Sequence, residues 1–116
     1  MGAGTTSGKN TASAAQQQQY NTPQQILAAK SAVAAIKNQK HTHTTITRPS
    51  DGHKLTVDIQ KVKQNAGYRV PYAYRITIDD ETAAAQGASL SEARIWYTYR
   101  DSLADAKKDA RRYLGI

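Results

Sequence analysis

One stretch of this chain constrains its fold more than any other, because residues 68–79 alternate between large apolar or aromatic side chains and smaller or polar ones. The side chains that would share one face are Tyr68, Val70, Tyr72, Tyr74, Ile76 and Ile78. A period of two over this length is typical of a half-buried β-strand. Pro71 cannot donate to a neighbouring strand, which favours an edge or a bulge near it. The stretch predicts a sheet with one buried face and one wet face.

Three further stretches show a β pattern. Residues 41–48 (HTHTTITR) are rich in β-branched threonine, and residues 53–63 place Leu55, Val57 and Ile59 on one face. In residues 93–100 (ARIWYTYR), alternation predicts Ile95, Tyr97 and Tyr99 on the buried face, and Arg94, Trp96, Thr98 and Arg100 on the outer face. Turn residues at 48–52 and 64–67 join the first three strands, which we therefore expect to be antiparallel neighbours.

Helical signals flank the strands. In residues 22–40, Thr22 is a candidate N-cap, Pro23 suits the first helical position, and we expect Lys37 and Lys40 in the last turn. This Ala-rich helix could pack on the body, pair with another helix or order only with a partner. A second helix is predicted from about Ser102 to Leu114, with its buried stripe at Leu103, Ala106, Ala110, Tyr113 and Leu114.

The predicted organisation has three parts. Residues 1–21 lack periodicity and have almost nothing to bury, so we expect a disordered polar leader, followed by the helix at 22–40 and a domain at 41–116. The fold class is α+β, with a small antiparallel sheet of three to four strands packed against the C-terminal helix. The predicted core is Leu55, Val57, Ile59, Val70, Tyr72, Tyr74, Ile76, Ile95, Tyr97, Leu103, Ala106 and Ala110.

Charge is distributed unevenly along the chain. The first forty residues contain four lysines and no Asp or Glu, whereas all nine acids lie in the remainder, beside the other twelve Lys and Arg. The chain as a whole has a formal net charge of +7. An acid-free arm of this kind is suited to lying on a polyanion.

Catalytic and metal sites are not indicated. The chain has no cysteine, and it contains no phosphate-binding loop or nucleophile motif. His41, His43 and His53 are close in sequence, but we expect exposed histidines rather than metal ligands. We interpret the acids at residues 79–81 as a solvated strand end rather than a Mg²⁺ or Ca²⁺ site. We therefore expect no enzyme activity, no cofactor and no metal.

The basic residues carry the functional prediction, which is a non-enzymatic protein that binds nucleic acid, either DNA or RNA. A sheet face with Arg and Lys beside an aromatic ring can hold phosphates and stack bases. The candidate binding residues are Lys30, Lys37, Lys40, Lys61, Lys63, Arg69, Arg75, Arg94, Trp96 and Arg100. The alternative is a small protein-binding module, such as an inhibitor, adaptor or virion component, that uses the N-terminal helix. The sequence has no membrane-spanning stretch or secretory signal, so we expect an intracellular protein, cytoplasmic or nucleoid-associated.

The end of the chain also carries a resemblance. RIWYTY (residues 94–99), followed by DSLADAKKDARRYL (residues 101–114), is similar in topology to the sheet-plus-helix DNA-binding modules at the front of tyrosine recombinases. The resemblance covers these residues alone and has no specific motif. It implies a DNA-binding module, in line with the charge.

Overall fold

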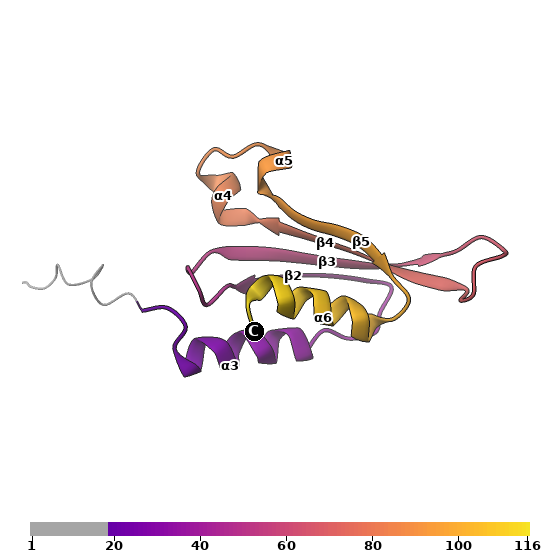
Figure 1. Cartoon of the computed structure of the whole chain (residues 1–116), viewed down its shortest axis with the longest axis horizontal. Coiled ribbons are helices and arrows are strands. Elements are labelled where there is room, and N and C mark those ends of the chain that lie inside the picture. The colour runs from indigo at the N-terminus through magenta and orange to yellow at the C-terminus, as the bar shows by residue number, and fades with distance from the viewer. Residues whose placement is uncertain (1–18) are drawn as a thin grey trace, which may run out of the picture.

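The computed structural model describes residues 19–116, so most of the predicted leader lies outside the described part. The elements are, in chain order, α3 (Pro23–Ala34), β2 (His41–Thr47), β3 (Lys54–Lys63), β4 (Tyr72–Asp80), α4 (Glu81–Ala85), α5 (Leu90–Ala93), β5 (Arg94–Arg100) and α6 (Leu103–Leu114) (Figure 1). None of the helices within residues 19–116 is long and apolar enough to cross a bilayer.

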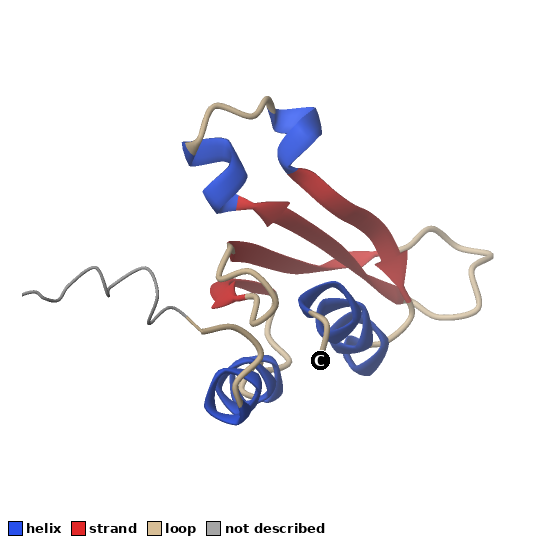
Figure 2. Ribbon diagram, turned by 60° about the vertical axis from the view of Figure 1, so that its left-hand side comes forward, coloured by secondary structure: helices blue, strands red, loops and turns tan. Residues whose placement is uncertain are grey.

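The four strands form one antiparallel sheet in the order β2-β3-β4-β5, so each strand pairs with its neighbour in sequence. Val57 in the middle of β3 lies opposite Thr44 of β2 and Ile78 of β4. Both long helices, α3 and α6, pack on the same face of this sheet (Figure 2). The α+β fold class predicted from the sequence is confirmed, with four strands.

The core lies between the sheet and the two helices. The strands contribute Ile46, Leu55, Val57, Ile59, Tyr74, Ile76 and Ile78, and α6 contributes Ala106, Ala110 and Leu114. Ala29 and Val33 of α3, with Ile36 just after it, complete the cluster. The sequence left open whether the first helix packs on the body, and it does, because its buried stripe is part of the same core.

Helix α3 begins where the sequence predicts and ends earlier. Thr22 and Gln25 form a reciprocal capping box, with the Gln25 N–H donating to Thr22 Oγ1 at 3.1 Å. The prediction that Lys37 and Lys40 lie in the last helical turn is wrong, because the helix stops at Ala34 and both residues lie in the connection to β2. Instead, Lys107 of α6 donates from Nζ to the Ala34 carbonyl oxygen at 3.2 Å. A cation from another helix thus provides a hydrogen-bond donor for a carbonyl oxygen at the C-terminal end of α3.

Strand β4 begins at Tyr72 rather than Tyr68. Residues 64–71 form the β3–β4 loop, in which Gly67 has a φ of 103° and the Gln64 N–H donates to the Pro71 carbonyl oxygen at 2.9 Å. Tyr68 is therefore exposed and Val70 only half-buried, while Tyr72 at the strand's end is 43% exposed. The predicted core positions at Val70 and Tyr72 are wrong, because the sheet extends there beyond the helices that cover it (Figure 1).

Strand β5 lies where predicted, with Ile95 packed against the core as expected, but from Trp96 onward its faces are reversed. The register places Trp96 opposite Ile78 and Arg100 opposite Tyr74, and both of these β4 residues are buried under the helices. A bulge between Ile78 and Asp79 shifts the pairing at the start of β5, so that Asp79 pairs with Arg94. Trp96 and Arg100 consequently lie on the helix-covered face. Tyr97, predicted to be in the core, is 49% exposed on the other face.

Candidate nucleic-acid interface

The face of the sheet turned away from α3 and α6 is the candidate interface, and we call it the open face. Alternation along the paired strands assigns its residues. From the β3–β4 loop towards α4, the paired rows are Val62 and Ala73; His41, Gln60, Arg75 and Tyr99; His43, Asp58, Thr77 and Tyr97; Thr45, Thr56, Asp79 and Arg94; and Thr47 and Lys54 at the β2–β3 turn. The two rows nearest the loop contain no acid, whereas Asp58 and Asp79 lie in the next two.

Two tyrosines project from β5 on the open face. The ring centroids of Tyr97 and Tyr99 are 5.9 Å apart in an edge-to-face arrangement, and their hydroxyl oxygens are 3.3 Å apart. Tyr99 is 50% exposed, close to the value for Tyr97. The rings support each other and present about half of their surface to solvent, which suits contact with another flat ring.

Arg75 is the cation between these tyrosines and β3. Its Nη2 donates to the side-chain oxygen of Gln60, the neighbouring residue on β3. Hydrogen bonds with Tyr97 and with Arg75 lower the pKa of the Tyr99 hydroxyl. Among the described residues, no carboxylate lies within ion-pair distance of Arg75. Its charge is therefore available for an anion from outside the chain.

A depression of about 440 Å³ adjoins Arg75 at the loop end of the open face. Its walls come from β3, the β3–β4 loop, β4 and β5: Val62, Lys63, Gln64, Asn65, Tyr68, Ala73, Arg75 and Tyr99. The set combines two aromatic rings, two cations and two side-chain amides. Aromatic and apolar surface with a few polar groups is the usual composition of a ligand site.

In the half of the open face that contains Asp58 and Asp79, both carboxylates pair with side chains of the same sheet. His41 Nε2 lies 3.1 Å, and His43 Nδ1 3.0 Å, from the carboxylate of Asp58. Burial raises the pKa of Asp58, but hydrogen bonds from both histidines outweigh it and hold that pKa below its ordinary value. Arg94 Nε donates to Asp79 Oδ1 at 2.5 Å. Because Asp58 and Asp79 carry negative charge, this half of the open face has little net positive charge.

Histidines do not gather into a metal site in the part of the chain described here. His53 lies at the β2–β3 turn, where its Nδ1 is 2.7 Å from Asp80 Oδ2, and so it is bound to a different carboxylate from His41 and His43. Within residues 19–116, no group of three or more His, Asp or Glu side chains could hold a metal ion.

The structure brings together only some of the predicted binding residues. Arg75 and Arg94 lie on the open face, and Lys63 lines the depression. Arg69 is in the β3–β4 loop, 90% exposed in its side chain and 3.8 Å from Asp101. Lys61 alternates onto the other face, with Nζ 4.5 Å from the centre of the Tyr72 ring.

Trp96 and Arg100 were predicted on the outer face, and that prediction is wrong. The Trp96 ring stacks on Tyr113 of α6 at 5.1 Å, and its Nε1 donates to Asp109 Oδ2 at 3.2 Å. Arg100 Nε donates to the same oxygen at 2.6 Å. Asp109 is 7% exposed, so one buried carboxylate on α6 holds both side chains against the helix.

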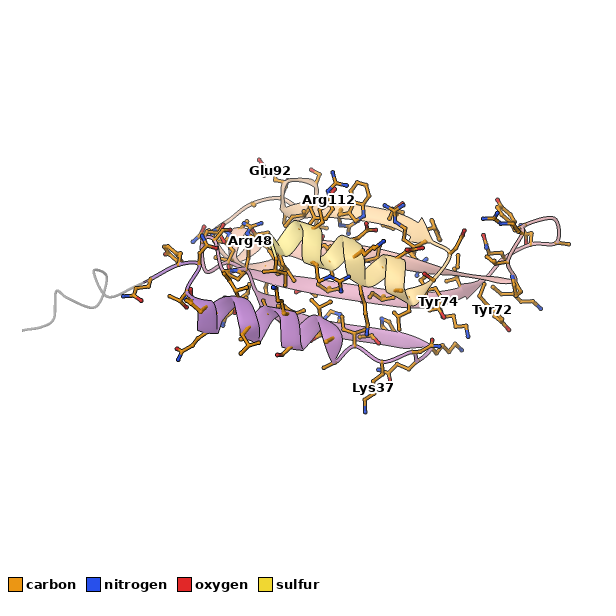
Figure 3. All side chains as sticks on the ribbon, turned by 60° about the horizontal axis from the view of Figure 1, so that its bottom comes forward. Lys37, Arg48, Tyr72, Tyr74, Glu92 and Arg112 are labelled. Atoms are coloured by element: carbon orange, nitrogen blue, oxygen red, sulfur yellow. The ribbon has the colours of Figure 1, made fainter. Side chains whose placement is uncertain are left out.

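Lysines of the predicted arm belong to the helical layer. Lys30 is exposed on α3, and Lys37 lies beyond the end of that helix and points away from the sheet (Figure 3). The cations of this layer with no carboxylate within ion-pair distance among residues 19–116 are Lys30, Lys37, Lys40, Lys107, Lys108, Arg111 and Arg112. The helical side of the molecule, rather than the sheet, therefore carries most of the uncompensated positive charge.

Sequence reasoning missed Tyr97, Tyr99, Tyr68 and Gln60 as residues of the open-face site. Both β5 tyrosines were assigned to the buried face, and Tyr97 to the core, because ARIWYTYR has bulky residues on both faces. The signal that could have decided between the faces is Asp109, which lies on the buried stripe of α6 and requires a hydrogen-bond donor or a cation opposite it.

Comparison with known protein families, with curated proteins and with solved structures gives no significant match. The fold and the open-face site therefore rest on the geometry of this chain alone.

Proposed function

We propose that this chain is a non-enzymatic nucleic-acid-binding protein whose contact surface is the loop end of the open face. The observation that carries the proposal is the conjunction of Arg75, which has no carboxylate partner among the described residues, with the half-exposed rings of Tyr97 and Tyr99. A cation for phosphate and aromatic rings for bases are the two elements of single-strand and loop recognition.

The other predicted cations take graded roles. Lys63 and Arg69, at the loop end, are placed for phosphate contacts, and Arg94 contributes less because Asp79 already pairs with it. Lys30, Lys37 and Lys40 lie on the helical side, where they raise the attraction for a polyanion over a distance rather than touch the same strand. Trp96 and Arg100 are excluded from the contact surface because α6 holds them.

A binding titration tests this proposal. Fluorescence anisotropy with labelled DNA and RNA, each single- and double-stranded, would be followed at two salt concentrations. We expect the affinity to fall steeply with salt, because Lys and Arg contacts release counterions from phosphates. Arg75→Ala should weaken binding more than Arg112→Ala, a matched charge removal on the exposed side of α6.

The result that overturns the proposal is equally simple. If the intact chain binds none of the four probes at low salt, or if Arg75→Ala and Arg112→Ala have the same effect, the open face is not a nucleic-acid interface. The protein-binding alternative would then be tested on its own, although the apolar stripe of α3 is already buried in the core.

A further inference from the structure

We propose that the open face selects an unpaired strand, with bases stacked on Tyr97 and Tyr99 and one nucleotide seated in the depression beside Arg75. This inference rests on the proposed function and names the form of nucleic acid that the site accepts. The proposed ligand is a single-stranded polynucleotide. The DNA and RNA probes described below test which of the two kinds of single strand is bound.

The shape of the depression fits one nucleotide. Its volume of about 440 Å³ lies within the range of about 300–1,000 Å³ found for small-molecule clefts. Tyr68 and Tyr99 supply ring surface, Gln64 and Asn65 supply amide donors and acceptors that can meet a base edge, and Lys63 supplies a cation. A base with its own phosphate can therefore find a ring, a hydrogen bond and a positive charge in one place.

The tyrosine rings favour bases that are not paired. Tyr97 and Tyr99 hold each other in an edge-to-face contact and each ring stays about half exposed, with the Arg94 guanidinium 5.9 Å from the centre of the Tyr97 ring. A ring of this kind can stack only on a base whose flat face is free. In a duplex that face is covered by the neighbouring base pairs, whereas a single strand can turn it outwards.

The width of the sheet argues in the same direction. Four strands spaced about 4.8 Å apart put roughly 14 Å between the outermost strand axes. The major groove of B-form DNA is about 12 Å wide and admits a helix or a two-stranded ribbon. The open face is broader than that groove and does not fit into it. Bases can therefore reach the sheet only when they are turned outwards from an unpaired strand.

The distribution of charge on the open face determines the path that we propose for the bound single strand. Arg75, which has no carboxylate within ion-pair distance among the described residues, lies in the acid-free half, and Lys63 flanks the same depression. Asp58 and Asp79 occupy the other half and would repel a phosphate backbone. We therefore place the backbone across the loop end of the sheet, from Tyr99, in the row of Arg75, towards Lys63.

The experiment compares matched probes and matched tyrosines. The probes are labelled oligothymidylate and oligouridylate of about 12 nucleotides, within the span of single-strand site sizes, and a mixed-sequence DNA duplex of the same length. Tyr99→Ala should lower the affinity for the single strands about 5- to 150-fold, the measured range for one stacked base. Tyr99→Phe keeps the ring and should retain most of the affinity. Tyr72→Ala removes an exposed tyrosine from the opposite face and should leave binding unchanged.

The outcomes separate the two proposals. Tighter binding of the single strands than of the duplex, together with sensitivity to Tyr99→Ala but not to Tyr72→Ala, supports the inference. Equal or tighter binding of the duplex, or a Tyr99→Ala variant that binds like the wild type, overturns it and leaves the proposed function standing. Binding of no probe overturns the proposed function itself. If circular dichroism shows that Tyr99→Ala is unfolded, Tyr99→Thr, which removes the ring but keeps a residue of high β-propensity at this position, is used with the same criteria.

Discussion

Asp109 decides the orientation of β5 more than any other single residue. Its carboxylate accepts from Trp96 and twice from Arg100, with Arg100 Nη2 at 3.2 Å from the second oxygen. A carboxylate that is almost fully buried needs a cation or several donors, because its charge has lost most of its water. The same pairing holds the pKa of the Arg100 guanidinium above its ordinary value. Two residues that resemble nucleic-acid contacts in the sequence are thus structural.

Trp96→Phe tests this assignment. The change keeps an aromatic ring against Tyr113 but removes the donor to Asp109, so we expect the free energy of unfolding to fall by about 0.5–1.5 kcal/mol, the net value of one hydrogen bond. Binding of nucleic acid should not change. The measurements are urea denaturation and the anisotropy titration, with Tyr72→Phe as the control at an exposed ring outside the open face. A Trp96→Phe protein of unchanged stability and weakened binding would place Trp96 on the open face.

At the scale of elements, the sequence predicts the sheet well and the faces of β5 poorly. Residues 53–63 alternate between apolar and polar side chains, so the register of β3 against the core follows directly from the pattern. Residues 93–100 carry bulky side chains on both faces, and the bulge beside Ile78 shifts the pairing by one residue. The choice is made by α6, the helix that follows β5, because it contributes the buried Asp109. The periodicity of the strand alone does not show a hydrogen-bond partner that lies on the next element.

The turn between β2 and β3 carries an acid-sensitive cluster. Arg48 donates from Nε to Asp51 Oδ1 at 2.9 Å, and the His53 N–H donates to the same oxygen at 3.0 Å. The hydrogen bond from Arg48 is the main reason that the pKa of Asp51 falls from its ordinary value of 3.8 to about 2. Asp80, at the adjacent end of β4, has its pKa lowered too: burial raises it, but the Ala83 N–H and His53 outweigh that effect.

Acid titration of stability tests this cluster. A carboxylate whose folded-state pKa is depressed stabilises the fold above its unfolded-state pKa, and this contribution is lost as the pH falls through the folded-state value. We therefore expect the Asp51 contribution to be complete above about pH 4 and to disappear towards pH 2. Asp51→Asn should be less stable at neutral pH and should show a shallower loss between these values. Parallel stability curves for the two proteins would show that the Arg48–Asp51 pair contributes nothing.

For the whole molecule, charge and stacking surface lie on different sides. The helical layer carries most of the uncompensated Lys and Arg, including Arg112 on α6 (Figure 3), whereas the exposed tyrosine pair and Arg75 lie on the open face. A field from the helical side attracts a polyanion over the Debye length but cannot fix its register. Under the proposed function, the tyrosines and Arg75 would supply the short-range contacts. A charge count alone therefore predicts attraction to a polyanion but does not predict the contact surface.

Two truncations distinguish the contribution of the N-terminal residues to binding from the contribution of α3 to stability. Removing residues 1–18 takes away one lysine, Lys9, and leaves α3 in place, so we expect the chain to stay folded and the salt dependence to fall by no more than about one phosphate contact. Removing residues 1–40 takes Val33 and Ile36 from the core and should lower the melting temperature strongly. Thermal unfolding by circular dichroism measures both. A 41–116 chain with unchanged stability would contradict the packing of α3 on the sheet.

The central claim is that the open face, and not the helical face, touches the nucleic acid. The most direct measurement is chemical-shift mapping by NMR, with labelled protein titrated with oligothymidylate of about 12 nucleotides. We predict that the amide signals of Arg75, Tyr97 and Tyr99 shift with the titration, while the indole N–H of Trp96, held by Asp109 beneath α6, stays in place. Shifts that gather on α6 and the Trp96 indole, with the β5 tyrosines unmoved, would contradict the account.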